Sequence, residues 1–124
     1  MIFRRPLLGV LLAAVAALPA AATGDPGRGK RVFAAQCSSC HGVKPGQTVL
    51  GPSLFGIVGR RSASVPNFAY SKAMKAASWT WTAGQLRTYL PSPKVVVLGT
   101  KMAYAGLKKP DQVEDLIAYL ETVR

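Results

Sequence analysis

Three kinds of reactive side chain are scarce in this sequence. Its 124 residues include one histidine, two cysteines and three methionines. The histidine and both cysteines, Cys37, Cys40 and His41, stand within five consecutive positions. No second histidine is left for a metal site or a catalytic site elsewhere in the chain. The chemistry of this protein is therefore expected to start from this one short segment.

The sequence also lacks an uninterrupted apolar run of the roughly 20 residues that a transmembrane helix needs. Its one long apolar run follows Arg4 and Arg5 and is closed by Pro19, before small residues up to Ala22. This order of charged, apolar and small residues is typical of a secretory signal peptide. We predict that residues 1–22 are removed after Ala22, that the protein is exported to the periplasm, and that residues 23–124 form one domain. A retained membrane anchor is the alternative.

Acidic residues are few, with 5 Asp and Glu against 16 Lys and Arg. Without Arg4 and Arg5, 14 basic residues remain against 5 acidic ones, so the mature chain carries a net charge of +9. An exported chain rarely meets nucleic acid, and no base-reading motif is present, which argues against a nucleic-acid partner. Acidic proteins or anionic membrane surfaces are the expected partners.

The mature chain shows no convincing strand, and its periodicity predicts an all-α domain. The first predicted helix spans residues 27–40, the second begins at Thr82 and stops at Pro91, and the third spans residues 110–124. A shorter helical turn is expected at residues 71–77. Two stretches rich in Gly and Pro, residues 42–69 and 92–109, are predicted as long loops, which are uncommon in compact domains and usually functional.

The segment from Cys37 to His41 has the form C-x-x-C-H, the attachment signature of a c-type haem. At the end of a helix, this spacing brings both sulfurs and the imidazole to one side. A zinc site, a thioredoxin-like dithiol and an inert disulfide are the alternatives. Zinc would need a fourth ligand, and the βαβ pattern of thioredoxin-like proteins is missing. One covalent haem c with His41 as an iron ligand is therefore the preferred interpretation.

A second iron ligand would have to be a methionine, because no other histidine exists. Met74 lies in a helical-looking stretch, where methionine usually fills a core. Met102 lies in the second long loop, which could wrap around a ring and present a sulfur to its far face. The residues alone favour Met102 and leave Met74 as the alternative.

The order of the motifs is similar to that of class I cytochrome c, the mitochondrial-type and related bacterial members. The resemblance covers nearly all of residues 24–123 and rests on "GKRVFAAQCSSCHG", "GPSLFGIVGR", "FAYSKAM", "WTAGQLRTYL", "GTKMAYAG" and "EDLIAYL". It implies a small all-α domain in which three main helices and long loops surround one covalently attached haem. It also implies Met102 as the sixth ligand.

The resemblance implies further roles for single residues. The carbonyl of Pro52 would accept a hydrogen bond from His41, Arg60, Tyr70 and Trp81 would bind the haem propionates, Tyr89 and Thr100 would lie near the Met102 sulfur, and Tyr104 would lie beside the exposed haem edge. Core packing is the alternative for the aromatic residues. Gly29 and Phe33 are expected to pack against Leu116 and Tyr119 where the first and last helices cross.

Two positions depart from the family pattern. Met74 stands where the family commonly has an asparagine close to the haem, and Leu98 replaces the usual proline of the methionine loop, after Val95 to Val97. The resemblance therefore leaves open how the polar network inside the pocket is built. It also predicts a methionine loop that is less preorganised.

With both axial positions of the iron filled, only electrons could enter and leave. We therefore expect a monomeric electron carrier rather than an enzyme. It would shuttle electrons between a membrane cytochrome bc complex or periplasmic dehydrogenase and a terminal oxidase or photosynthetic reaction centre. Lys94, Lys101 and Lys108, with Lys30 and Arg31, would meet acidic redox partners transiently. A haem enzyme or gas binder with a vacant site and a thiol redox protein are the other classes.

Overall fold

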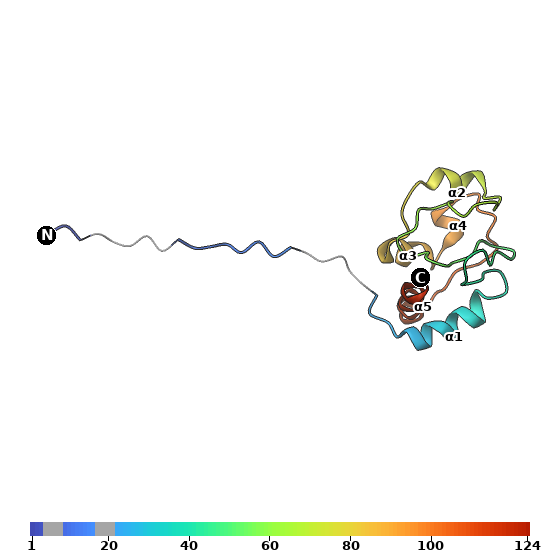
Figure 1. Cartoon of the computed structure of the whole chain (residues 1–124), viewed down its shortest axis with the longest axis horizontal. Coiled ribbons are helices and arrows are strands. Elements are labelled where there is room, and N and C mark those ends of the chain that lie inside the picture. Colours follow the sequence, from blue (N-terminus) through green and yellow to red (C-terminus); the bar gives the residue numbers. More distant parts are fainter. Residues whose placement is uncertain (4–8, 17–21) are drawn as a thin grey trace.

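Residues 22–124 fold into five α-helices joined by long loops (Figure 1). The computed structural model describes residues 1–3, 9–16 and 22–124, and within these ranges it contains no strand. The helices are α1 (Pro26–Gln36), α2 (Lys72–Ala77), α3 (Ala83–Tyr89), α4 (Pro93–Val96) and α5 (Pro110–Thr122). The prediction of an all-α fold with long loops is confirmed.

Much of the predicted signal peptide lies outside the described residues. This holds for Arg4, Arg5, Pro19 and Ala20, on which the prediction depends. Among the described residues, no helix has both the length and the apolar character needed to cross a membrane.

Helices α1 and α5 cross in close contact at one end of the domain (Figure 1). Gly29 is buried at the crossing, where an added Cβ atom would lie 1.8 Å from the backbone oxygen of Asp115. One turn later, the rings of Phe33 and Tyr119 pack with centroids 5.7 Å apart. The two helices can approach this closely because residue 29 has no side chain.

The crossing places the apolar stripe of α5 in the interior. Pro110 occupies the first turn, and Asp111 complements the helix dipole there. Four buried apolar residues of α5 join the core that α1 and α3 also contribute to, namely Val113, Leu116, Ile117 and Leu120. The helix predicted at residues 110–124 is present as α5, but it ends two residues earlier, at Thr122.

The first helix is shorter than the sequence pattern predicts. We expected it to reach residue 40, but α1 ends at Gln36 and Cys37 is its C-cap. The backbone oxygen of Phe33 accepts hydrogen bonds from the amides of Cys37 (2.8 Å) and Ser38 (3.0 Å), which closes the helix. A turn then follows in place of a last helical turn, because this bifurcated bond ends the regular ladder.

Two shorter helices begin at side-chain caps. Ser71 caps α2 by accepting a hydrogen bond from the amide of Met74 (3.0 Å), and Thr82 caps α3 in the same way for Gln85 (3.0 Å). These bonds satisfy amides that have no partner within the helix. The helix predicted to begin at Thr82 is therefore present as α3.

Helix α4 lies inside a stretch that we predicted to be a loop. Its four residues start at Pro93, whose ring fits a first helical position, and Val97 follows as a buried C-cap with 3% exposure. Val95 and Leu98 remain exposed. One side chain of the valine run, Val97, is therefore buried in the core. The loop-like composition of this stretch did not indicate this burial.

Gly29→Ala is expected to lower the free energy of unfolding by about 1–3 kcal/mol, because a methyl group at this crossing would overpack the interface. Gly84→Ala is the matched control, since a Cβ atom there would meet its nearest neighbour, the Thr82 hydroxyl, only at 3.8 Å. Urea unfolding of the purified protein measures both. Equal stability of the two variants would contradict the close crossing.

Candidate haem site

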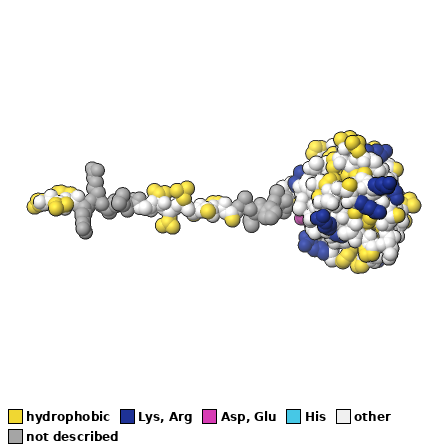
Figure 2. All heavy atoms as spheres, turned by 90° about the horizontal axis from the view of Figure 1, so that it is seen from above, with side chains coloured by type: hydrophobic (Ala, Val, Ile, Leu, Met, Phe, Trp, Pro, Cys, Tyr) yellow, Lys and Arg dark blue, Asp and Glu magenta, His cyan; other side chains and the backbone are white. Residues whose placement is uncertain are grey.

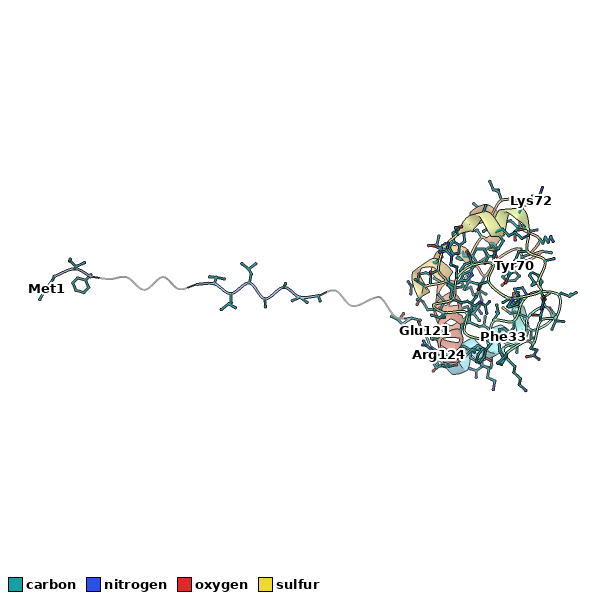
Figure 3. The ribbon with its side chains drawn as sticks, turned by 45° about the horizontal axis from the view of Figure 1, so that its top comes forward. Met1, Phe33, Tyr70, Lys72, Glu121 and Arg124 are labelled. Atoms are coloured by element: carbon teal, nitrogen blue, oxygen red, sulfur yellow. The ribbon has the colours of Figure 1, made fainter. Side chains whose placement is uncertain are left out.

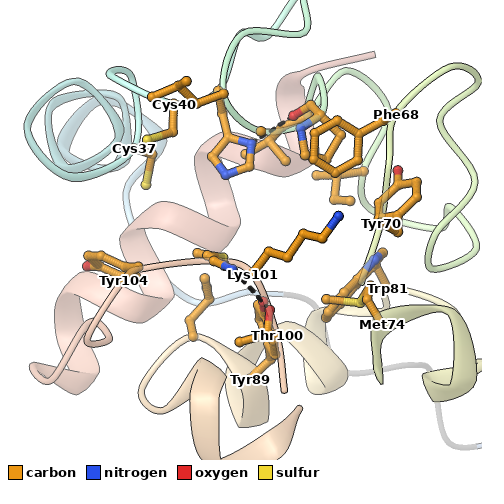
Figure 4. Close-up of a pocket in the computed structure, with 18 of the residues that line it drawn as sticks. Cys37, Cys40, Phe68, Tyr70, Met74, Trp81, Tyr89, Thr100, Lys101 and Tyr104 are labelled. Atoms are coloured by element: carbon orange, nitrogen blue, oxygen red, sulfur yellow. Dashed lines mark hydrogen bonds between the residues drawn. The ribbon is translucent and has the colours of Figure 1, made fainter. Parts of the chain in front are cut away.

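A cavity of about 520 Å³ occupies the centre of the domain and is lined mainly by apolar atoms (Figure 4). It lies between the turn that follows α1, the loop residues 50–71, helix α3 and the residues 100–104, and Leu116 and Leu120 of α5 form part of its wall. Every residue predicted to contact the cofactor lines it: Cys37, Cys40, His41, Pro52, Arg60, Tyr70, Trp81, Tyr89, Thr100 and Met102.

The two cysteines and the histidine reach the cavity from a tight turn. The backbone oxygen of Cys37 accepts hydrogen bonds from the amides of Cys40 (3.1 Å) and His41 (3.0 Å). These bonds keep the helix-like spacing after α1 has ended, so the three side chains still face one space. The chemical argument from their spacing therefore holds although the helix boundary was wrong.

The thiol of Cys37 is a poor nucleophile in this position. Burial, and then the neighbouring Cys40, raise the pKa of Cys37 to about 11. A dithiol that exchanges disulfides needs a lowered thiol pKa, so the geometry argues against a thioredoxin-like role. No disulfide joins Cys37 and Cys40, and the described residues contain no cluster of three or more His, Cys, Asp or Glu side chains that could hold a metal ion.

The ring of His41 is fixed with one nitrogen available. Nδ1 donates a hydrogen bond to the carbonyl oxygen of Pro52 (2.7 Å), which leaves Nε2 as the unprotonated nitrogen. Burial lowers the pKa of His41, against the opposing effect of the Pro52 carbonyl. The side chain is thus neutral at pH 7 and can act as a metal ligand through Nε2.

The backbone beside the ring is held by residues that the sequence did not single out. Gly51 lies so close that an added Cβ atom would be 2.4 Å from His41 Cε1, and its amide donates to the carbonyl of Cys40 (2.8 Å). Buried Ser53 donates its hydroxyl to the carbonyl of Lys44 (2.6 Å). In the sequence, only the glycine directly before Pro52 could have indicated that the backbone approaches the His41 ring so closely.

The loop after α4 places Met102 on the cavity wall. Its sulfur accepts a hydrogen bond from the hydroxyl of Tyr89 (3.3 Å), and its amide donates to the hydroxyl of Thr100 (3.3 Å). Burial raises the pKa of Tyr89 to about 12, although the Thr100 side chain acts in the other direction. The phenol therefore stays a hydrogen-bond donor throughout the physiological range.

Met74 lines the same cavity from α2, on the side where Tyr70 and Trp81 lie (Figure 4). Its side chain is packed against the hydrophobic core. Both candidate methionines thus reach the cavity, and the Tyr89 hydroxyl distinguishes Met102 as the one whose sulfur is oriented by a hydrogen bond.

One corner of the cavity holds the half-buried cation Arg60 and therefore favours a negatively charged group. Arg60 donates through Nη1 to the carbonyl of Phe55 (2.8 Å), but its buried Nε atom has no hydrogen-bond partner among the described residues. Burial lowers the pKa of Arg60, and neighbouring Tyr70 raises it. A buried donor without a partner is unfavourable, so an anionic group in the cavity would satisfy it.

Two side chains span the edge of the cavity. Lys101 donates its ammonium group to the carbonyl of Ala69 (2.9 Å), and the hydroxyl of Tyr104 donates to the amide oxygen of Gln36 (2.9 Å). Both bonds join segments far apart in sequence. Gln36 was not predicted as a site residue.

The donor set fits a haem. The sulfurs of Cys37 and Cys40 and the free imidazole nitrogen of His41 face an apolar cavity, and a thioether sulfur is held on the methionine loop. The unpartnered Arg60 nitrogen suits a carboxylate. Of the predicted partner-binding lysines, Lys101 also lines this cavity, whereas Lys30, Lys94 and Lys108 do not.

Comparisons with known proteins agree with this site. The family model described as "Cytochrome c" matches residues 27–124. The chain is 47% identical to cytochrome c type-1 of Ascaris suum over 84% of this chain and 93% of that protein. It is 42% identical to cytochrome c2 of Blastochloris viridis over 95% of this chain and 92% of that protein. The solved structure of cytochrome cH from Methylobacterium extorquens superposes with a TM-score of 0.75 at 38% identity, covering 80% of this chain and 99% of that one.

The buried phenol of Tyr89 is expected to ionise only as the pH approaches about 12. Its raised pKa contributes stability that is complete below the unfolded value of about 10 and is lost as pH rises through about 12. Titration of ¹³C-labelled tyrosine rings by NMR measures this pKa, and the spectrum of Tyr89→Phe identifies the Tyr89 signal. Ionisation of Tyr89 near pH 10 in the wild-type protein would contradict this burial.

Proposed function

Because the chain belongs to the class I cytochrome c family and carries one covalently attached haem c, we propose that it is a soluble periplasmic one-electron carrier in which His41 and Met102 would bind the iron. Members of this family are electron-transfer proteins and not enzymes. The single observation that carries the proposed ligand set is one cavity that gathers the thiols of Cys37 and Cys40, the free nitrogen of His41 and the oriented sulfur of Met102.

The chain's own residues fix the donors. The sulfurs of Cys37 and Cys40 would hold the macrocycle covalently, and the Pro52 carbonyl would keep Nδ1 of His41 protonated so that Nε2 is the ligand. When bound, the haem supplies a reversible one-electron change between ferric and ferrous iron, and a methionine ligand raises its potential. With donors on both sides, no coordination position would remain for a substrate.

The polar corner would hold the acidic groups of the cofactor. Arg60 offers its unpartnered Nε atom, and Tyr70 and Trp81 line the cavity near it. The Tyr70 hydroxyl accepts a hydrogen bond from the amide of Val65 (3.0 Å), so its own proton remains available for donation. These three residues are proposed to bind the propionates.

Export rests on the sequence at the N-terminus. Residues 1–22 are proposed to be a signal peptide that is removed, leaving residues 23–124 as the mature domain. A covalent haem suits an exported protein, because the two thiols would then be occupied in an oxidising compartment.

The surface charge supports acidic redox partners. Basic side chains are spread over the face shown in Figure 2, while an acidic one is visible only at its edge near the N-terminal segment. Lys94, Lys101 and Lys108 are all exposed, and the last two also donate their ammonium groups to the carbonyls of Ala69 and Pro91. We propose that the monomeric carrier takes electrons from a membrane cytochrome bc complex or periplasmic dehydrogenase. It would pass them to a terminal oxidase or photosynthetic reaction centre.

Met102→Ala is expected to abolish the weak sulfur-to-iron charge-transfer band of the oxidised protein and to lower its reduction potential. The haem should stay covalently attached, as a haem-stained denaturing gel would show. Met74→Ala is the matched control and should keep the band. The reverse pattern would assign the sixth ligand to Met74.

Lys94→Glu is expected to slow oxidation of the reduced protein by ferricyanide several-fold at low salt, because it replaces an exposed cation of the proposed docking surface with a carboxylate that repels an anionic reagent. Stopped-flow absorbance at increasing ionic strength measures the rate, which should fall as charges are screened over about 8 Å at physiological salt.

Arg124→Glu is the control, since it changes the net charge equally and lies beyond the end of α5. A cationic cobalt(III) complex should show the opposite salt dependence. Equal slowing of ferricyanide oxidation in both variants would show that only net charge matters and would contradict a docking role for Lys94.

A further inference from the structure

Residues 22–25, which include the predicted cleavage site between Ala22 and Thr23, lie along α5 and contact its acidic side chains. The amide of Ala22 donates to Glu121 Oε1 (3.2 Å), the amide of Thr23 to Glu114 Oε2 (3.3 Å), and the amide of Asp25 to Asp115 Oδ1 (2.8 Å). Figure 3 shows Glu121 at the edge of the domain where the N-terminal segment joins it. Three of the five acidic residues of the sequence thus meet this short segment.

The position of the segment is fixed by Gly24. An added Cβ atom there would lie 2.3 Å from the backbone nitrogen of Asp115 and from the backbone carbon of Glu114. Residue 24 therefore rests directly on the α5 backbone, a contact that any side chain would prevent. This constraint sets which amide reaches which carboxylate.

The three carboxylates differ in how far they are neutralised. Asp115 is paired with Arg28 (3.1 Å), and Glu114 is paired with Arg87 of α3. Glu121 forms no ion pair among the described residues and receives only the neutral amide of Ala22. Glu114 and Glu121 therefore both face the start of the predicted mature chain, and only one arginine, Arg87, is available to neutralise the two carboxylates.

We propose that Glu114 and Glu121 form a binding site for the α-ammonium group of Thr23, created when the leader is removed. Hydrolysis of the bond between Ala22 and Thr23 by a peptidase adds one water molecule: Ala22 leaves with a carboxylate, and the Thr23 nitrogen takes up protons to become an ammonium group. The cation then stands where the structure has the amide nitrogen of Thr23, within hydrogen-bond distance of Glu114. Loss of the Ala22 amide leaves Glu121 available as a second acceptor.

This inference rests on the proposed export and adds a consequence to it. The precursor has a neutral amide at this position, so only the processed chain can form the ion pair and close the N-terminal segment onto α5. Processing would thereby stabilise the crossing of α1 and α5, which directly precedes the haem-binding turn. The groups that face the new terminus are Glu114, Asp115 and Glu121 of α5, Arg87 of α3 and Arg28 of α1.

The pH dependence has a definite sign. Carboxylate neighbours raise the pKa of the α-ammonium group above its ordinary value of about 8. Its contribution to stability is therefore complete below about pH 8 and is lost as pH rises through the raised value. On the acidic side, hydrogen bonding by Arg87 and by the Thr23 amide helps to lower the pKa of Glu114, so that contribution is lost as pH falls through the lowered value.

The test uses the exported holoprotein. Intact mass should correspond to a chain that begins at Thr23. Reductive ¹³C-methylation of the amines, followed by NMR titration of the reduced protein, should give an α-amino pKa about one unit above the reference, a tenfold change in proton affinity. Glu114→Gln and Glu121→Gln should each move it back toward the reference, whereas the control Asp111→Asn, on the same helix, should not.

An α-amino pKa at the reference value in the wild type would overturn the proposal, as would a mature chain that begins elsewhere. The absorbance spectrum and reduction potential of the same samples test the carrier function separately. Retention of both in Glu114→Gln, with the α-amino pKa lowered, would locate the effect at the terminus and not at the haem.

Discussion

The close crossing of α1 and α5 determines where the site can be. Gly29 allows the two backbones to touch, and this contact fixes the end of α1, from which the turn carrying Cys37 and Cys40 continues directly. The same contact turns Leu116 and Leu120 toward the central cavity. One missing side chain thus connects the position of the covalent attachment turn with the wall of the cavity that receives the cofactor.

Much of the protein around the cavity is irregular backbone. A bound cofactor would explain how these loops keep a fixed arrangement. The described loops pair only in isolated bridges, such as His41 with Thr48, and are otherwise held by side-chain and single backbone hydrogen bonds. A small domain buries a limited apolar surface, so a covalently attached haem that fills the central cavity would supply much of the missing core. The unpartnered Nε atom of Arg60 supports the same role for the cofactor, because a buried donor without a hydrogen-bond partner is unfavourable until an anionic group accepts its hydrogen bond.

Acidic and basic side chains lie in different regions of the domain, and we infer that the two regions have different roles. The five acidic residues all come from the start of α1 or from α5, and two of them form the ion pairs with Arg28 and Arg87 that hold this end of the domain together. The methionine loop and the cavity edge carry lysines and no acid. A redox partner could therefore be attracted to one region, while the acidic side chains stabilise another.

The sequence by itself determined the cofactor and the all-α class, because C-x-x-C-H, the helix caps and the apolar stripe of α5 act through local spacing. Other side chains that line the cavity, such as Arg60, Tyr70 and Tyr89, were expected only from the family resemblance. The sequence pattern placed the end of the first helix wrongly and missed α4. The bifurcated bond at Phe33 is local, but the helical pattern of the sequence does not indicate it. The burial of Val97 depends on packing against core residues that are distant in the sequence. Tertiary structure alone decided that Gly51 lies against the His41 ring, that Tyr89 donates to the sulfur of Met102, and that Thr23 meets Glu114. Those contacts join residues separated along the chain, and only the packed helices bring their atoms within hydrogen-bond distance.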